Sequence, residues 1–73
     1  MTLTAGQIQY MVEEITADLI RMTMEHEGLS MHEAFDKVYN SKTYHNVLNP
    51  QSQLYYQSSG YVYDLLTEEV PTS

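Results

Sequence analysis

The sequence of 73 residues has no cysteine, no tryptophan, two prolines and only three lysine or arginine residues. Without cysteine the chain forms no disulfides, and it has no Cys/His spacing typical of structural zinc. No apolar run approaches the roughly 18 residues that cross a bilayer, so we expect no membrane-spanning segment. The first residues also lack the basic and then apolar pattern of a secretory leader, so we expect a cytoplasmic protein.

Positive charge is scarce throughout the chain. Ten acidic residues against three basic ones give a formal net charge of -7. This balance repels phosphate backbones and anionic lipid surfaces, so we expect no nucleic-acid partner and no membrane partner. In the tyrosine-rich segment 39–63, Lys42 is the one fixed charge, whereas a groove for single-stranded nucleic acid needs several cations.

The chain is also short for a stable domain. A domain of this size buries only about 60% of the surface that its unfolded chain exposes, so its stability is marginal. Well-capped helices and self-association are the reinforcements left to a chain without disulfides or zinc. The sequence shows no internal repeat, low-complexity tract or linker, so residues 1–73 are expected to form a single small helical domain.

A long first helix, from Thr4 to about Glu27, is the clearest expected element. Its apolar residues recur at the spacing of one helical face. They are Ile8, Met11, Val12, Ile15, Leu19 and Met22. Thr4 is a residue type that caps helix N-termini, and Gly28 can adopt the left-handed conformation that ends a helix.

A second, shorter helix follows from a capping signal. Ser30 and Glu33 have the spacing of a capping box, which predicts a helix that begins near Met31 and fades near position 40 or 41. Its expected buried stripe is Ala34, Phe35 and Val38, with Tyr39 beside it.

Two more short helices are predicted from their caps. Ser41 can cap a helix that Asn49-Pro50 ends, and Ser58 or Ser59 can cap a last helix that stops before Pro71. The inward faces are expected to be Tyr44, Val47 and Leu48 in one helix, and Tyr61, Val62, Leu65 and Leu66 in the other. The segment 54–56 is either a helical turn or an extended crossing. The expected fold is all-α: a compact bundle of three to four helices in which a long first helix is followed by shorter ones.

The first helix has more apolar surface than one face needs. Tyr10, Ala17 and Met24 recur every seven residues on the side opposite the main stripe, and Ile20 lies between them and Met22. These residues are candidates for self-association in a homodimer. In the alternative interpretation, the long helix is central and the shorter helices wrap this second face.

Tyrosines concentrate in one part of the chain, where six of the seven lie between Tyr39 and Tyr63. Tyr39, Tyr44 and Tyr61 fall on or beside predicted buried stripes, so their rings are expected to fill the core. Tyr55, Tyr56 and Tyr63 are harder to bury together, because Tyr55 and Tyr56 are adjacent and Tyr63 is expected to point away from the Val62 and Leu66 face. At least one of the three is therefore expected to be exposed. With nearby glutamines and serines they have the composition of a recognition surface, so they are candidate partner-binding residues; the alternative is simple edge packing.

Catalytic and metal chemistry find little support in the sequence. His26, His32 and His45 have no metal-ligand spacing, although a chance site using His26 and His32 stays open. There is no nucleophile-elbow pattern, glycine-rich phosphate loop or paired carboxylate in an apolar setting. We therefore expect no cofactor, no metal and no catalytic residue.

Three motifs in the last two thirds of the chain carry a resemblance. They are G-L-S-M-H-E-A-F, Y-N-S-K-T-Y-H-N-V-L and L-Y-Y-Q-S-S-G-Y-V-Y-D-L-L, and they lie between Gly28 and Glu69. This stretch resembles a family of short bacterial proteins of unknown function with the patterns S-x-x-E-A, Y-x-S-x-x-Y and L-Y-x-x-S-x-x-Y-V-Y-x-x-L. The resemblance implies a compact helical fold and brings no activity or catalytic residue with it. The long first helix matches in general character only.

Three functional hypotheses follow. The leading one is a non-catalytic, acidic, helical interaction module that binds a protein partner or itself. The second is a small-ligand-binding or enzymatic domain that uses Tyr55, Tyr56 and Tyr63 with His45. The third is an acidic inhibitor or antitoxin-like partner that occupies a basic surface, which predicts one continuous acidic face. That face would include Glu13, Glu14, Asp18 and Glu25.

Overall fold

The computed structural model of this protein describes residues 2–69. Over this range the chain is helical and contains no strand, which confirms the all-α fold with a long first helix. The helices are α1 (Ala5–Glu27), α2 (Met31–Tyr39), α3 (Lys42–Leu48) and α4 (Ser59–Glu68), and two single 3-10 turns, η1 (Pro50–Ser52) and η2 (Leu54–Tyr56), join α3 to α4. Segment 54–56 is therefore a helical turn. The predicted stop at Pro71 lies outside the described residues.

The helix boundaries lie where the capping residues predict them. Thr4 accepts a hydrogen bond from the Gln7 backbone N–H, and the Gln7 side chain accepts one from Thr4, so α1 begins with a capping box. Ser30 and Glu33 form the predicted second box at the start of α2. Gly28 ends α1 at a φ of 67°, in the left-handed region that a residue without Cβ adopts at little cost. Local sequence thus determines most of the boundaries.

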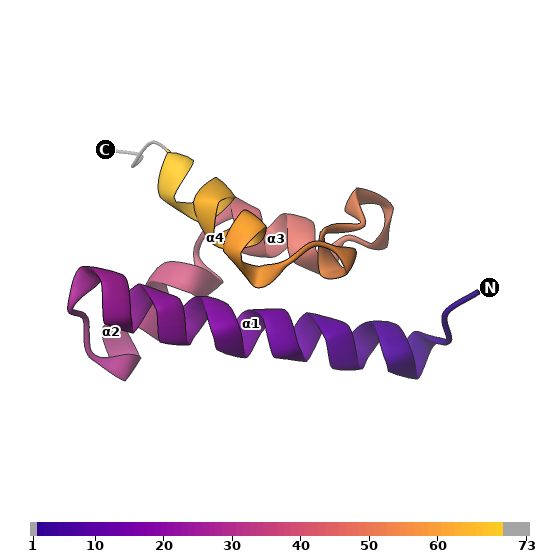
Figure 1. The fold of residues 1–73 in the computed structure, drawn as a ribbon, viewed down its shortest axis with the longest axis horizontal. Helices are drawn as coiled ribbons and strands as arrows, with labels where there is room; N and C mark the ends of the chain where they lie inside the picture. Colours follow the sequence, from indigo (N-terminus) through magenta and orange to yellow (C-terminus); the bar gives the residue numbers. More distant parts are fainter. Residues whose placement is uncertain (1, 70–73) are drawn as a thin grey trace.

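The elements form two layers. Figure 1 shows α1 as one layer, α3, η1, η2 and α4 as the other, and α2 at the C-terminal end of α1. Helix α4 contacts both α1 and α3. The buried core between the layers comprises Ile15, Leu19, Val38, Val47, Tyr55, Val62, Tyr63 and Leu66. A core this small explains why polar contacts also help to hold the layers together.

A polar contact within the second layer joins the end of α4 to the start of α3. The Glu69 carboxylate accepts hydrogen bonds from the backbone N–H groups of Lys42 at 2.9 Å and Thr43 at 2.8 Å. Ser41 Oγ accepts the next one, from the Tyr44 N–H at 3.0 Å. The free N–H groups of the first turn of α3 are therefore satisfied partly by a residue at the far end of α4.

The predicted burial is wrong for several residues. Four residues were expected to lie in the core but are exposed: Phe35 at 43%, Tyr39 at 39%, Leu48 at 50% and Tyr61 at 51%. Tyr63 was expected to point away from the Val62 and Leu66 face. It is buried instead, with an exposed fraction of 8%. Because α4 contacts α1 on one side and α3 on the other, its buried arc is centred on Val62 and Tyr63 and leaves Tyr61 outside.

Candidate protein-docking surface

Three aromatic rings from two helices lie in a row, the first two stacked and the third tilted by 44° to the second; we call Phe35, Tyr39 and Tyr44 the aromatic ladder. The rings of Phe35 and Tyr39 are nearly parallel, with centroids 4.1 Å apart, and the rings of Tyr39 and Tyr44 are 4.6 Å apart. Phe35 and Tyr39 lie one turn apart on α2, and Tyr44 comes from α3. The ladder therefore bridges the α2–α3 junction.

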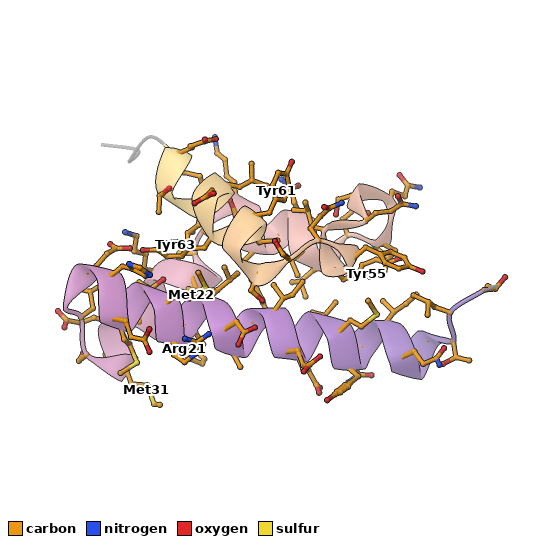
Figure 2. All side chains as sticks on the ribbon, in the orientation of Figure 1. Arg21, Met22, Met31, Tyr55, Tyr61 and Tyr63 are labelled. Atoms are coloured by element: carbon orange, nitrogen blue, oxygen red, sulfur yellow. The ribbon has the colours of Figure 1, made fainter. Side chains whose placement is uncertain are left out.

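The outer two rings of the ladder are partly exposed, whereas Tyr44 is half-buried. Phe35 is 43% and Tyr39 is 39% exposed, and Met31, one turn before Phe35, is 66% exposed. Figure 2 shows Met31 projecting outward from the start of α2. Together these side chains form an apolar strip along α2 that stays partly exposed in residues 2–69.

A groove separates the ladder from α1. It has a volume of about 250 Å³, and its lining residues are Val12, Glu13, Thr16, Ala17, Ile20, Tyr39 and Tyr44. Thr16 donates its hydroxyl hydrogen to the Val12 carbonyl oxygen at 2.7 Å. The floor is thus built from α1 and one wall from the ladder, and Glu13 is the one acidic group among its lining residues. We call it the ladder groove.

The Tyr44 ring forms the inner end of the ladder. Burial raises the pKa of the Tyr44 hydroxyl, and hydrogen bonding and proximity to the Tyr39 hydroxyl raise it further, while the Thr16 hydroxyl lowers it. The Tyr44 phenol is therefore neutral near pH 7, and the Tyr39 and Tyr44 hydroxyls offer hydrogen-bonding groups beside the floor of the groove. This mixture of aromatic area and polar tips is typical of protein-recognition surfaces.

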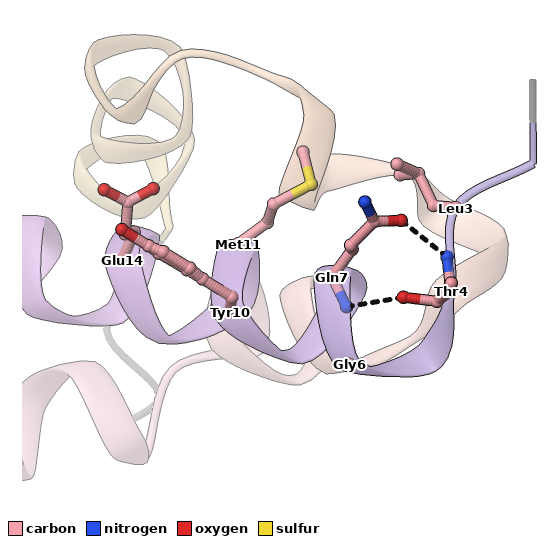
Figure 3. Close-up of a pocket in the computed structure, with 7 residues that line it drawn as sticks. All are labelled: Leu3, Thr4, Gly6, Gln7, Tyr10, Met11 and Glu14. Carbon is pink, nitrogen blue, oxygen red and sulfur yellow. Dashed lines mark hydrogen bonds between the residues drawn. The ribbon is translucent and has the colours of Figure 1, made fainter.

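The four candidate self-association residues lie partly on this surface. Tyr10 and Ala17 are exposed, whereas Ile20 and Met24 are half-buried. Ala17 and Ile20 line the ladder groove, so the structure joins them to the ladder. Tyr10 lies farther toward the N-terminus of α1, beside Glu14. Both line a shallow pocket with a volume of about 550 Å³, to which Leu3 and Met11 also contribute (Figure 3).

The candidate partner-binding tyrosines do not converge. Tyr55 and Tyr56 are neighbours with ring centroids 5.2 Å apart, but Tyr55 is 8% exposed and Tyr56 is 55% exposed. The Tyr63 ring lies 5.3 Å from the His26 ring, and its hydroxyl donates to Glu27 Oε2 at 3.2 Å. Figure 2 places Tyr55 and Tyr63 at different ends of the molecule. Of the three, Tyr56 presents its ring to solvent.

Tyr63 belongs to a structural network. Burial raises the pKa of the Tyr63 hydroxyl, and the hydrogen bond to Glu27 raises it further. Glu27 also forms an ion pair with Lys37 of α2. The group therefore links α1, α2 and α4.

The histidines and acids are also dispersed. His26 contacts Tyr63, His32 lies 3.4 Å from Asp36, and within residues 2–69 no group of three His, Asp or Glu side chains is placed to hold a metal ion. The predicted continuous acidic face of α1 is interrupted, because Arg21 lies 3.5 Å from Asp18 and 3.4 Å from Glu25. Within the same range, no helix has the length and apolarity that a membrane crossing requires.

No known protein family, curated protein or solved structure matches this chain. The resemblance over Gly28–Glu69 therefore stays a prediction. Three serines of its motifs, Ser30, Ser41 and Ser58, are N-caps of α2, α3 and α4. In this structure these motif positions therefore fix where three helices begin.

Sequence reasoning missed the ladder as a surface feature. The available signal was that α2 has two adjacent apolar stripes, Ala34 with Val38 and Met31 with Phe35 and Tyr39, each at a spacing of four residues. One neighbouring helix covers one stripe of so short a helix. The second stripe is therefore left exposed.

Proposed function

We propose that this chain is a non-catalytic interaction module that docks another polypeptide on the aromatic ladder and the ladder groove. The observation that carries the proposal is the exposure of a stacked aromatic pair, Phe35 and Tyr39, next to Met31. Aromatic residues and methionine are enriched at protein interfaces, and rigid aromatic rings bury large areas at low entropic cost.

The composition of the ladder groove supports binding over catalysis. Its lining residues include one carboxylate, from Glu13, which accepts a hydrogen bond from the Gln9 amide at 3.3 Å. They include no histidine or second carboxylate with which Glu13 would share a proton. A volume of about 250 Å³ is also below the usual range for small-molecule sites, about 300–1,000 Å³.

A second copy of the chain is an alternative occupant of the same surface. The exposure of Tyr10 and Ala17 on the outer face of α1 favours it. Light scattering coupled to size exclusion at micromolar concentration measures the mass directly. A dimer that becomes monomeric on Ala17→Glu substitution supports self-association, and a monomeric wild-type protein with full helicity contradicts it.

The docking proposal is tested with two matched double variants. Phe35→Ser/Tyr39→Ser removes the outer part of the ladder, and Leu48→Ser/Tyr61→Ser removes two apolar side chains of similar exposure outside it. Circular dichroism confirms that both variants keep wild-type helicity. A partner captured from native cells is purified and titrated into each protein, and its affinity is expected to fall about 100-fold for the ladder variant only. Equal affinities of the two variants would contradict the proposal.

A further inference from the structure

The charges around the ladder groove indicate what kind of polypeptide it accepts. Each lysine and arginine of the chain is already beside an acid: Arg21 pairs with Asp18 and Glu25, Lys37 pairs with Glu27, and Lys42 lies near Glu69. The chain has no other lysine or arginine. A lysine or arginine that would pair with a further acid must therefore come from a partner.

Glu13 of the ladder groove and its neighbour Glu14 lack such a cation. Glu13 lines the ladder groove and Glu14 lies beside Tyr10, and neither belongs to an ion pair among residues 2–69. Both are exposed. They are one to two helical turns from Ala17 and Ile20, about 5–10 Å along α1. The surface thus combines an apolar aromatic centre with a negative rim.

We infer that the occupant of the ladder groove is a basic amphipathic helix of another protein, an inference that rests on the proposed docking function. Its apolar side chains cover Ala17, Ile20 and Tyr39, and a lysine or arginine one to two turns away reaches Glu13 or Glu14. A second copy of this chain is a poorer fit, because it brings its own Glu13 and Glu14 and the same net charge of -7. Complementary charge would also speed association.

Three synthetic peptides of about 18 residues test the inference. One has leucines at helical spacing on one face and lysines on the other, the second has glutamate in place of lysine, and the third has the composition of the first in scrambled order. Each is titrated into isotope-labelled protein, and affinity and chemical shifts are measured. We expect binding of the first peptide only, with shifts at Ala17, Ile20 and Tyr39. Its affinity should fall about tenfold between about 20 and 150 mM salt.

Two charge variants distinguish the effect of acids beside the groove on peptide binding from the effect of the overall net charge. Glu13→Gln/Glu14→Gln and Asp64→Asn/Glu68→Gln remove the same number of acids, the first pair at the groove and the second on α4. We expect the first variant to bind the lysine peptide about fivefold more weakly and the second to match the wild type. Equal losses in the two variants, or equal binding of the ordered and scrambled lysine peptides, would overturn the inference.

The ladder variant distinguishes this inference from the docking function. If Phe35→Ser/Tyr39→Ser leaves binding of the lysine peptide unchanged, both proposals fail. If that variant loses binding of a natural partner whose affinity is insensitive to salt and to Glu13→Gln/Glu14→Gln, the docking function stands and the inference fails. A wild-type dimer that the ladder variant converts to monomer identifies a second copy as the occupant, which also overturns the inference.

Discussion

At the scale of single residues, Thr23 has a buried hydroxyl group that makes no hydrogen bond within residues 2–69. Its side chain is completely buried. Thr16, seven residues earlier on α1, is buried as well but donates to the Val12 carbonyl oxygen. The two threonines therefore provide a matched pair.

Replacing Thr23 with valine keeps the shape of the side chain and removes the unsatisfied hydroxyl. We expect Thr23→Val to raise the free energy of unfolding by about 1 kcal/mol, because the cost of burying that hydroxyl disappears. Thr16→Val is the control and is expected to bring no gain. Urea denaturation of both variants measures the difference, and a loss of stability in Thr23→Val would contradict it.

Two glycines give opposite predictions for the same substitution. Gly28 has a φ of 67°, so Gly28→Ala strains the backbone and should lower the free energy of unfolding by about 1 kcal/mol. Gly60 lies in the first turn of α4, and a Cβ there meets no atom within 4 Å. Gly60→Ala should therefore raise stability by about 0.5 kcal/mol, since alanine favours helix. Thermal unfolding checks both signs.

At the scale of elements, the N-terminus of α3 depends on Glu69. Burial alone would raise the pKa of Glu69, but hydrogen bonds from the Thr43 side chain and from the backbone N–H groups of Lys42 and Thr43 outweigh it. The pKa is therefore lowered from its ordinary value of 4.5. This contribution to stability is fully present above pH 4.5 and is lost as the pH falls through the lower folded pKa.

Substitution of Glu69 tests the cap. Glu69→Gln should lower the free energy of unfolding by about 1 kcal/mol at pH 7 and should flatten its decrease below pH 4.5. Glu68→Gln is the matched control; it removes an acid from the last turn of α4, where the helix dipole disfavours it, and should stabilise slightly. Similar effects of the two substitutions would contradict a specific role for Glu69.

The elements also show which structural features local sequence predicts and which it does not. Thr4, Ser30 and Ser41 predicted the starts of three helices, and the pair Ser58 and Ser59 predicted that of α4, where Ser58 is the cap. Such predictions succeed because a cap depends on residues three positions apart. Which way a short helix faces depends on what packs against it. Helices α2 and α4 have apolar residues on more than one side, so sequence periodicity assigned Phe35 and Tyr61 inward and Tyr63 outward, and packing reversed these assignments.

At the scale of the whole molecule, net charge opposes folding. Ten acids lie on a chain with three basic residues, and all thirteen lie within the described range, so self-repulsion is a property of the folded surface. Raising salt from about 10 to 150 mM should increase the midpoint of thermal unfolding by roughly 3 °C, because salt screens this repulsion. A midpoint that falls with salt would show that the ion pairs of Arg21 and Lys37 outweigh the repulsion.

The sequence by itself determined the all-α class, the helix starts, the end of α1 at Gly28 and the acidic surface. These depend on local backbone geometry and on composition, which act over a few residues or over the whole chain. Tertiary structure alone decided that Glu69 caps α3, that Tyr63 is buried and that Tyr39 and Tyr44 line a groove with Ala17 and Ile20. Such contacts join residues distant in sequence, and no local preference encodes them.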